Sequence, residues 1–314
     1  MMPLLMLIGG LGLLIFGGNA LLKSSVSISL KLSIPKIVVG MTVVSFATSL
    51  PELVVSLKAA LAGTPDLAMG NVVGSNAANL GLVLGITLLF GSMDVTKSFY
   101  KIDWPVMMIA SLMLLGFVFF DSLLSSLEGG VLVLSMVGFL WWLLKVQTSP
   151  AVIDELPEDD ELLSNASTFI YLLLGGVGLW LGSEWLVSGA VTLAESFGVS
   201  DRVIGITVVA VGTSIPELAA SIIAVIKKEK AISLGNLVGS NIFNIFSVLG
   251  ITALVTPIPI VDQGFITNDL FFMVFIAFVV LPLVFIPSKL KLNWKDGLIL
   301  LSIYGFFVYR VVIG

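Results

Sequence analysis

The chain of 314 residues contains no cysteine and no histidine. Without cysteine there is no disulfide framework and no thiolate metal site. Without histidine the chain lacks the usual zinc ligand, the commonest general base and the Ser–His pair of many hydrolases. We therefore expect no enzymatic activity and no organic cofactor.

Charged residues are also scarce. They make up 11% of the chain, whereas hydrophobic residues make up 58% and the mean hydropathy is +1.14. A soluble domain carries about 25% charged residues. This composition predicts an all-α protein that crosses the membrane many times and has little mass outside it. We expect the lipid bilayer, and no nucleic acid, among its partners.

One segment of the chain occurs twice. Residues 40–87 are repeated at residues 205–252, with a constant offset of 165 and no gap, and 23 of the 48 aligned positions are identical. The identities cluster on polar residues, which a lipid environment would penalise. We therefore expect the two copies to share one function.

Ten apolar stretches are long enough to cross a bilayer, which takes about 20 residues. An acidic linker at 148–166 divides them into two five-helix halves, residues 1–147 and 167–314. The ten predicted spans are 4–29, 35–62, 67–91, 104–120, 123–146, 167–195, 202–226, 231–256, 269–287 and 295–313.

Basic residues predict the orientation, because Lys and Arg gather on the cytoplasmic side of membrane proteins. With ten spans, nearly all the lysines between spans fall on the same side as the acidic linker, which places both termini outside. The first copy of the repeat then enters the membrane beside Lys36, from the cytoplasm, and the second beside Arg202, from the outside. The two halves are therefore predicted to be inverted repeats, the plan of many secondary transporters.

Each copy carries a Pro-Glu pair inside an apolar span. The pair ends Ala-Thr-Ser-Leu-Pro-Glu at Ala47–Glu52 and Gly-Thr-Ser-Ile-Pro-Glu at Gly212–Glu217. The proline removes a backbone N–H and disrupts the helix ahead of it, which frees carbonyls near Thr48 and Thr213. A carboxylate near the bilayer centre costs about 2.5–3.5 kcal/mol. A chain with two of them in duplicated settings needs their negative charge, and the simplest need is a bound cation.

A second segment in each copy, at Gly70–Asn79 and Gly235–Asn244, contains the pattern Gly-Ser-Asn-x-x-Asn. Its small residues allow close approach of helices. All candidate donors in the two segments are oxygens, which suits a hard ion such as Ca²⁺ and not Zn²⁺. They are the carboxylates of Glu52 and Glu217, the hydroxyls of Ser49, Ser75, Ser214 and Ser240, and the amides of Asn79 and Asn244.

These duplicated motifs resemble the α-repeats of the cation/calcium exchanger superfamily, in its sodium/calcium exchanger branch. The ten-span plan with a short central linker is similar to that of prokaryotic members. The resemblance covers essentially the whole chain. It implies a monomeric antiporter that moves Ca²⁺ out across a prokaryotic cytoplasmic membrane, driven by Na⁺, by alternating access at a midplane site.

The resemblance also implies a role for each site residue. Glu52 and Glu217 would bind Ca²⁺ together with backbone oxygens of Thr48 and Thr213. Asn79 and Asn244 would complete the centre. The Na⁺ positions would share both glutamates and add oxygens of Ser45, Ser49, Ser75, Ala210, Ser214 and Ser240.

The chain departs from the family pattern at one of these positions. Several sodium/calcium exchangers have Asp where this chain has Asn244, which leaves the ion stoichiometry and any dependence on K⁺ open. A Ca²⁺/H⁺ antiporter, with protons on the glutamates in place of Na⁺, is an alternative within the same class, although Ser75 and Ser240 favour Na⁺. A cation channel is a more distant alternative, since a channel more naturally uses a ring of symmetric subunits.

Overall fold

The computed structural model of the chain describes residues 2–146, 162–197, 212–260, 264–286 and 289–313. These residues form two compact units, each of which combines segments from both halves of the sequence. The described residues within Met1–Thr48 and Trp141–Asn236 form unit 1, and those within Ser49–Leu140 and Leu237–Gly314 form unit 2. One boundary between them, Thr48 to Ser49, lies at the break that Pro51 predicts.

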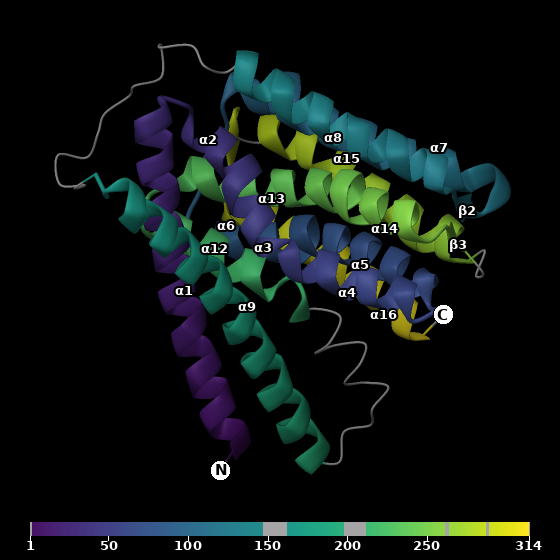
Figure 1. The fold of residues 1–314 in the computed structure, drawn as a ribbon, viewed down its shortest axis with the longest axis horizontal. Helices are drawn as coiled ribbons and strands as arrows, with labels where there is room; N and C mark the ends of the chain where they lie inside the picture. The colour runs from purple at the N-terminus through teal and green to yellow at the C-terminus, as the bar shows by residue number, and fades with distance from the viewer. Residues whose placement is uncertain (1, 147–161, 198–211, 261–263, 287–288, 314) are drawn as a thin grey trace. The chain divides into compact units, whose positions relative to one another are not determined.

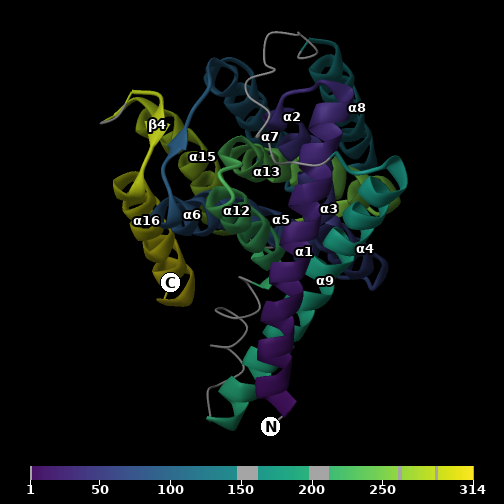
Figure 2. The same ribbon diagram turned by 90° about the vertical axis from the view of Figure 1, so that its left-hand side faces the viewer.

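Unit 1 is built on two long helices, α1 (Met2–Leu32) and α9 (Asn165–Ser196), which lie side by side (Figures 1 and 2). α12 packs against both of them. The other elements are α2 (Lys36–Val39), the π-helical turn η1 (Gly40–Val44), α3 (Ser45–Thr48), α12 (Ile215–Ile226) and the first half of α13 (Lys230–Phe243).

Glycines bring α1 and α9 into backbone contact. A Cβ atom added at Gly17 would lie 2.6 Å from the backbone nitrogen of Leu179, and one added at Gly175 would lie 2.6 Å from that of Leu21. Both distances are shorter than any ordinary Cβ contact. Small residues allow this approach, which is how helices associate in membranes where lipid removes the hydrophobic driving force.

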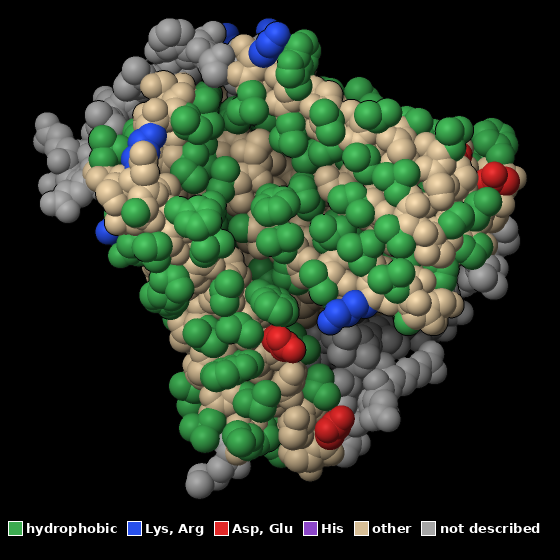
Figure 3. Space-filling model, viewed as in Figure 1, with side chains coloured by type: hydrophobic (Ala, Val, Ile, Leu, Met, Phe, Trp, Pro, Cys, Tyr) green, Lys and Arg blue, Asp and Glu red, His purple; other side chains and the backbone are tan. Residues whose placement is uncertain are grey.

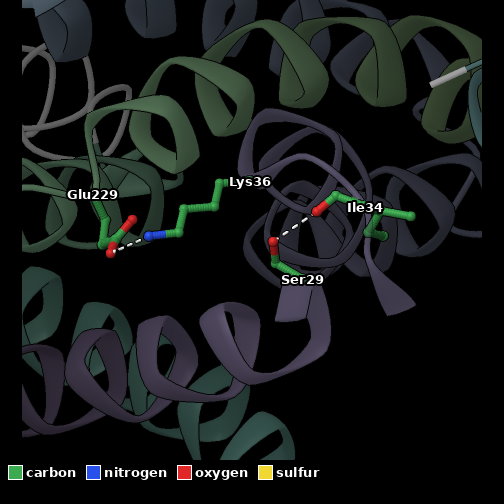
Figure 4. A network of polar contacts seen from close by, with 4 residues as sticks. All are labelled: Ser29, Ile34, Lys36 and Glu229. Atoms are coloured by element: carbon green, nitrogen blue, oxygen red, sulfur yellow. Dashed lines mark hydrogen bonds and ion pairs between the residues drawn. The ribbon is translucent and has the colours of Figure 1, made fainter. Parts of the chain in front are cut away.

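An ion pair closes one end of unit 1. Lys36, the first residue of α2, donates to Glu229 Oε1 at 2.7 Å, and Glu229 lies in the turn between α12 and α13 (Figure 4). Nearby, the Ser29 hydroxyl donates to the Ile34 carbonyl at 2.7 Å and closes the turn after α1. The pair is mostly shielded, with 26% and 11% of the two side chains exposed, so it is screened less by salt than a surface pair.

Unit 2 contains the remaining helices. In it α4 packs on α5, α6 on α16, and α7 on α15. Its elements are α4 (Leu50–Leu61), α5 (Pro65–Ala78), η2 (Asn79–Val83), α6 (Leu84–Phe90), η3 (Phe99–Asp103), α7 (Trp104–Asp121), most of α8 (Ser126–Val146), the second half of α13, η6 (Asn244–Leu249), α14 (Gly250–Val255), η7 (Phe265–Leu270), α15 (Phe271–Phe285) and α16 (Trp294–Ile313).

Four two-residue strands join the two sequence halves within unit 2. β1 (Met93–Asp94) pairs antiparallel with β4 (Lys291–Leu292), and β2 (Leu123–Leu124) pairs antiparallel with β3 (Ile258–Pro259). Each pair takes one strand from each half, in exchanged positions, which is the pattern expected of two halves related by a two-fold axis. These short strands were not predicted from the sequence.

The repeat seen in the sequence is also present in the secondary structure. α12 begins and ends 165 residues after α4, and α13 begins and ends 165 residues after α5. A π-helical turn follows at the same position in each copy, starting at Asn79 and at Asn244. Gly63 and Lys228 end α4 and α12 in the same left-handed conformation, with φ of 81° and 66°. Equivalent residues therefore fold in the same way.

Pro51 has the predicted effect on the first copy. α3 ends at Thr48, α4 begins at Leu50 with Pro51 as its second residue, and the two segments are bent by 44°. In the second copy α12 begins in the same way, at Ile215, followed by Pro216. The helix before it falls outside the described residues.

Hydrophobic side chains cover most of the face seen in Figure 3, with few charged side chains among them. Within the described ranges, seven helices are long and apolar enough to cross a membrane, and the bent pair formed by Lys36–Thr48 and Leu50–Leu61 would make eight. The protein is therefore a helical membrane protein with many spans. The first part of the predicted span 202–226, and the linker up to residue 161, lie outside the described ranges.

We predict that the contact between α1 and α9 tolerates no side chain at its glycines. Gly17→Ala places a Cβ against the backbone of α9, and overpacking of this kind costs about 1–3 kcal/mol. Gly12→Ala is the matched control in the same helix, because a Cβ there meets no atom within 4 Å. Thermal unfolding of the purified variants in detergent should show a lower midpoint for Gly17→Ala only. Equal midpoints would show that the two helices are not packed this closely.

Candidate cation-binding site

The two glutamates occupy equivalent positions in helices. Glu52 lies in the first turn of α4 and Glu217 in the first turn of α12, and both side chains are fully buried. The first turn of a helix presents unpaired N–H groups and a partial positive charge, which stabilises a nearby carboxylate. The break that precedes each helix therefore gives its glutamate a local environment that favours negative charge.

Four asparagines form a network in unit 2. Asn244 Nδ2 donates to Asn76 Oδ1 at 3.0 Å, and Asn79 Nδ2 contacts Asn241 Oδ1 at 3.4 Å. Asn76 Nδ2 donates to the Asn241 carbonyl at 3.2 Å. The first two contacts exchange under the 165-residue offset, so the network has the symmetry of the repeat. All four side chains are buried.

Two oxygens of this network remain available. The Oδ1 atoms of Asn79 and Asn244 are buried and accept no hydrogen bond from the residues that the structure describes. Each asparagine also starts a π-helical turn, and π-helical insertions are frequent at functional sites. Because a buried acceptor without a donor costs about 1–3 kcal/mol, these two oxygens are suited to a cation.

The helix of Glu52 lies beside this network. α4 contacts both α5, which carries Ser75, and the η6 turn that starts at Asn244. Asn71 on α5 binds α4 directly, because its Nδ2 donates to Ser56 Oγ at 3.1 Å and contacts the Glu52 carbonyl at 3.4 Å. Ser49 and Ser75 are buried in the same unit.

In unit 1, Asn236 links α3, α12 and α13. Its Oδ1 accepts from the Thr48 hydroxyl at 3.2 Å, and its Nδ2 donates to Ser221 Oγ at 3.2 Å. Its backbone carbonyl lies 2.9 Å from the Ser45 hydroxyl, which also lies 2.8 Å from the Gly40 carbonyl. Asn236 therefore holds the last turn before the break in place, including the backbone of Thr48.

A hydrogen bond from α9 fixes the turn that precedes Glu217. The Ser183 hydroxyl donates to the Gly212 carbonyl at 2.8 Å, directly before Thr213. Ser214 Oγ is buried and has no hydrogen-bond partner in the described part of the chain. A hydroxyl in this state is, like the asparagine oxygens of unit 2, a candidate ligand.

The chain matches the sodium/calcium exchanger protein family over residues 2–145 and 167–313. It belongs to this family. The chain is 35% identical to a putative antiporter from Alkalimonas amylolytica. The match covers 96% of this chain and 95% of the relative. The chain is 30% identical to a sodium/calcium exchanger from Methanosarcina acetivorans, with 97% of each covered. Among solved structures, the sodium/calcium exchanger from Methanococcus jannaschii superposes with a TM-score of 0.81 at 27% identity over 98% of both chains.

The donor set agrees with membership of the exchanger family. No group of three or more Asp, Glu, His or Cys side chains that could hold a metal occurs in the described ranges. The candidate donors are thus the two glutamates together with neutral oxygens. Ca²⁺ accepts such mixed oxygen sets of carboxylates, carbonyls and amides.

The site residues predicted from the sequence lie in both units of the structure. Ala210 lies outside the described residues. Unit 1 holds Ser45, Thr48, Thr213, Ser214 and Glu217, and unit 2 holds Ser49, Glu52, Ser75, Asn79, Ser240 and Asn244. No role was predicted from the sequence for several polar residues that hold these segments in place. These are Ser56, Asn71, Asn76, Ser183, Ser221, Asn236 and Asn241, and all but Ser183 are identical in the two copies, which is the signal that could have found them.

We predict that Asn236 is needed to position Thr48. Asn236→Ala removes the acceptor for the Thr48 hydroxyl and the donor to Ser221, and breaking buried hydrogen bonds costs about 1–3 kcal/mol. Asn19→Ala is the control, because the side-chain hydrogen bond that Asn19 makes among the described residues goes to a carbonyl of its own helix, that of Ile15 at 2.7 Å. Thermal stability and Ca²⁺ affinity of purified protein should both fall for Asn236→Ala and stay near wild type for Asn19→Ala. A normal Ca²⁺ affinity in Asn236→Ala would contradict the positioning role.

Proposed function

We propose that this membrane transporter is an antiporter that exchanges Ca²⁺ for Na⁺. The observation that carries the proposal is the complete burial of Glu52 and Glu217 in the first turns of two equivalent helices, each with a proline directly before its glutamate. The family match supports it, as does the name of the M. acetivorans relative, a sodium/calcium exchanger. Structures of the exchanger NCX_Mj were determined after soaking in Na⁺ with Ca²⁺ or Sr²⁺.

We assign the ligands by the resemblance of the repeated motifs to those of the sodium/calcium exchanger family. Glu52 and Glu217 provide the charge for Ca²⁺, with backbone oxygens of Thr48 and Thr213 beside them. Na⁺ uses the same glutamates with carbonyls and hydroxyls on either side. These are the oxygens of Ser45, Ser49, Ser75, Ala210, Ser214 and Ser240, with Asn79 and Asn244 at the centre.

Charge balance explains why such a site exchanges ions. Two ionised glutamates give it a formal charge of −2, which one Ca²⁺ or two Na⁺ neutralise. The empty site would leave two like charges in a low-dielectric interior, which is costly. Loaded forms therefore change conformation and the empty form resists, so one ion species leaves only in exchange for the other.

We place the protein in a prokaryotic cytoplasmic membrane, as a monomer with ten transmembrane helices in two inverted five-helix halves. Residues 1–147 and 167–314 are the halves, and the acidic linker 148–166 faces the cytoplasm, with both termini outside. The exchanged strand pairs and the repeated helix bounds support a two-fold relation between the halves. Alternating access by one half against the other is the mechanism this plan serves in secondary transporters.

Neutralising either glutamate should abolish transport. Glu52→Gln and Glu217→Gln keep the size of the side chain and remove the charge that Ca²⁺ requires. We expect no measurable ⁴⁵Ca²⁺ uptake into proteoliposomes, from protein that still purifies as a folded species. Glu184→Gln is the matched control, because Glu184 is exposed on α9 and lies outside both copies of the repeat. Near-normal uptake by either glutamine variant would rule out the assigned site.

The coupling ion separates this proposal from Ca²⁺/H⁺ exchange. Ser75 and Ser240 have buried hydroxyls that can bind Na⁺. Proton exchange on the glutamates would not need these hydroxyls. An outward Na⁺ gradient should drive Ca²⁺ into vesicles at equal pH on both sides, and Ser75→Ala or Ser240→Ala should raise the Na⁺ concentration required. Ser302→Ala, at an exposed serine of α16, should have no effect. If a pH gradient alone drives Ca²⁺ uptake and Na⁺ has no effect, the coupling ion is the proton and not Na⁺.

A further inference from the structure

Unit 2 contains a groove that the transport site does not use. It lies between η7 with α15 on one side and α16 on the other, and its volume is about 1030 Å³. Ligand pockets in proteins occupy about 300–1,000 Å³, so the groove is large enough for an organic molecule. Every lining residue belongs to the segments 264–275 and 302–311.

The walls of the groove are rich in phenylalanine. Phe272 and Phe307 stack across it, with ring centroids 4.1 Å apart and an angle of 9° between the rings. Phe271, Phe275 and Phe306 also line it and remain 43%, 51% and 62% exposed. Phe265–Phe285 is one of the segments apolar enough to span a membrane. The groove therefore opens on a face that hydrocarbon chains, and not water, would contact.

One end of the groove is polar and charged. η7 precedes α15 and Arg310 lies in the last turn of α16, so the antiparallel arrangement of the two helices brings Asp269 and Arg310 to the same end. Figure 2 shows β4 at one end of α16 and the C-terminus at the other, beside which Arg310 lies in sequence. The polar end is thus at the end of a membrane helix, where the interface with water begins.

The charge of Arg310 is not neutralised within the described part of the chain. Lys36–Glu229 is the ion pair found there, and the Arg310 guanidinium makes no hydrogen bond to a described residue. The equivalent cation in the first half of the sequence, 165 residues earlier, is Lys145 in the last turn of α8, and its Nζ lies 4.2 Å from the ring centroid of Trp141. A guanidinium binds phosphate through paired hydrogen bonds.

We propose that this groove binds one glycerophospholipid with an ammonium headgroup, of the phosphatidylethanolamine type. Arg310 binds the phosphate, and the carboxylate of Asp269 binds the ammonium group. An acyl chain lies along Phe272, Phe275 and Phe307. The combination of one cation and one anion at the polar end matches a zwitterionic headgroup better than an anionic one, because Asp269 repels a headgroup that carries only negative charge.

The test is a lipid-binding measurement by native mass spectrometry on the purified, delipidated full chain. The probe is an equimolar mixture of phosphatidylethanolamine and phosphatidylglycerol with identical acyl chains. We expect one retained lipid per chain, with phosphatidylethanolamine preferred. Arg310→Gln should reduce retention of both lipids at least about tenfold, or ~1.4 kcal/mol. Asp269→Asn should remove the preference while leaving binding intact, and Ile303→Trp should block the groove to both.

Lys145→Gln is the matched control, because it removes an exposed cation from the last turn of α8 and should leave retention unchanged. Equal retention by wild type and Arg310→Gln would overturn the proposal. A dimer that dissociates in Arg310→Gln would do so too, by showing that a second copy of the chain occupies the groove. None of these readouts depends on transport, so their failure and that of the exchange proposal are distinguishable.

Discussion

The structure depends on the burial of two carboxylates in apolar surroundings. Glu52 and Glu217 are fully buried. Removing a charge from water costs free energy, which nearby groups of the protein have to offset. Each lies in the first turn of a helix, where free N–H groups and the helix dipole favour an anion. The proline beside it, Pro51 or Pro216, is what makes a helix begin at that depth. Proline at this position also leaves backbone carbonyls without their helical partners, which is why we propose them as neutral ligands for a cation.

Asparagine is the residue that organises the polar interior. Asn236 fixes the last turn before the break in unit 1, and the Asn76, Asn79, Asn241 and Asn244 network fixes the start of two π-helical turns in unit 2. An amide carries donors and an acceptor without a formal charge, so it can satisfy a buried neighbour at no Born cost. In this protein the amide nitrogens bind other protein groups, while Asn79 Oδ1 and Asn244 Oδ1 remain as acceptors.

Membership of the sodium/calcium exchanger family could be predicted from the duplicated Pro-Glu and Gly-Ser-Asn-x-x-Asn motifs in apolar spans, and the family match confirms it. The break ahead of Pro51 could be predicted as well, since proline acts on the turn beside it. The contact between Thr48 and Asn236 could not, because the two residues are 188 positions apart and no local rule relates them. The close approach of α1 and α9 at Gly17 and Gly175 was missed for the same reason.

The sequence by itself determined the helical membrane class, the repeat, the position of the break and the chemical type of the donors. These follow from composition, from the repeated motifs and from proline's missing N–H, all of which can be read from the sequence without knowing how distant segments pack. Tertiary structure alone decided which amide holds which hydroxyl, which strands of the two halves pair, and that a phenylalanine groove ends on Asp269 and Arg310. Those features depend on how distant segments pack, and packing is set by the shapes of whole surfaces, which no single segment contains.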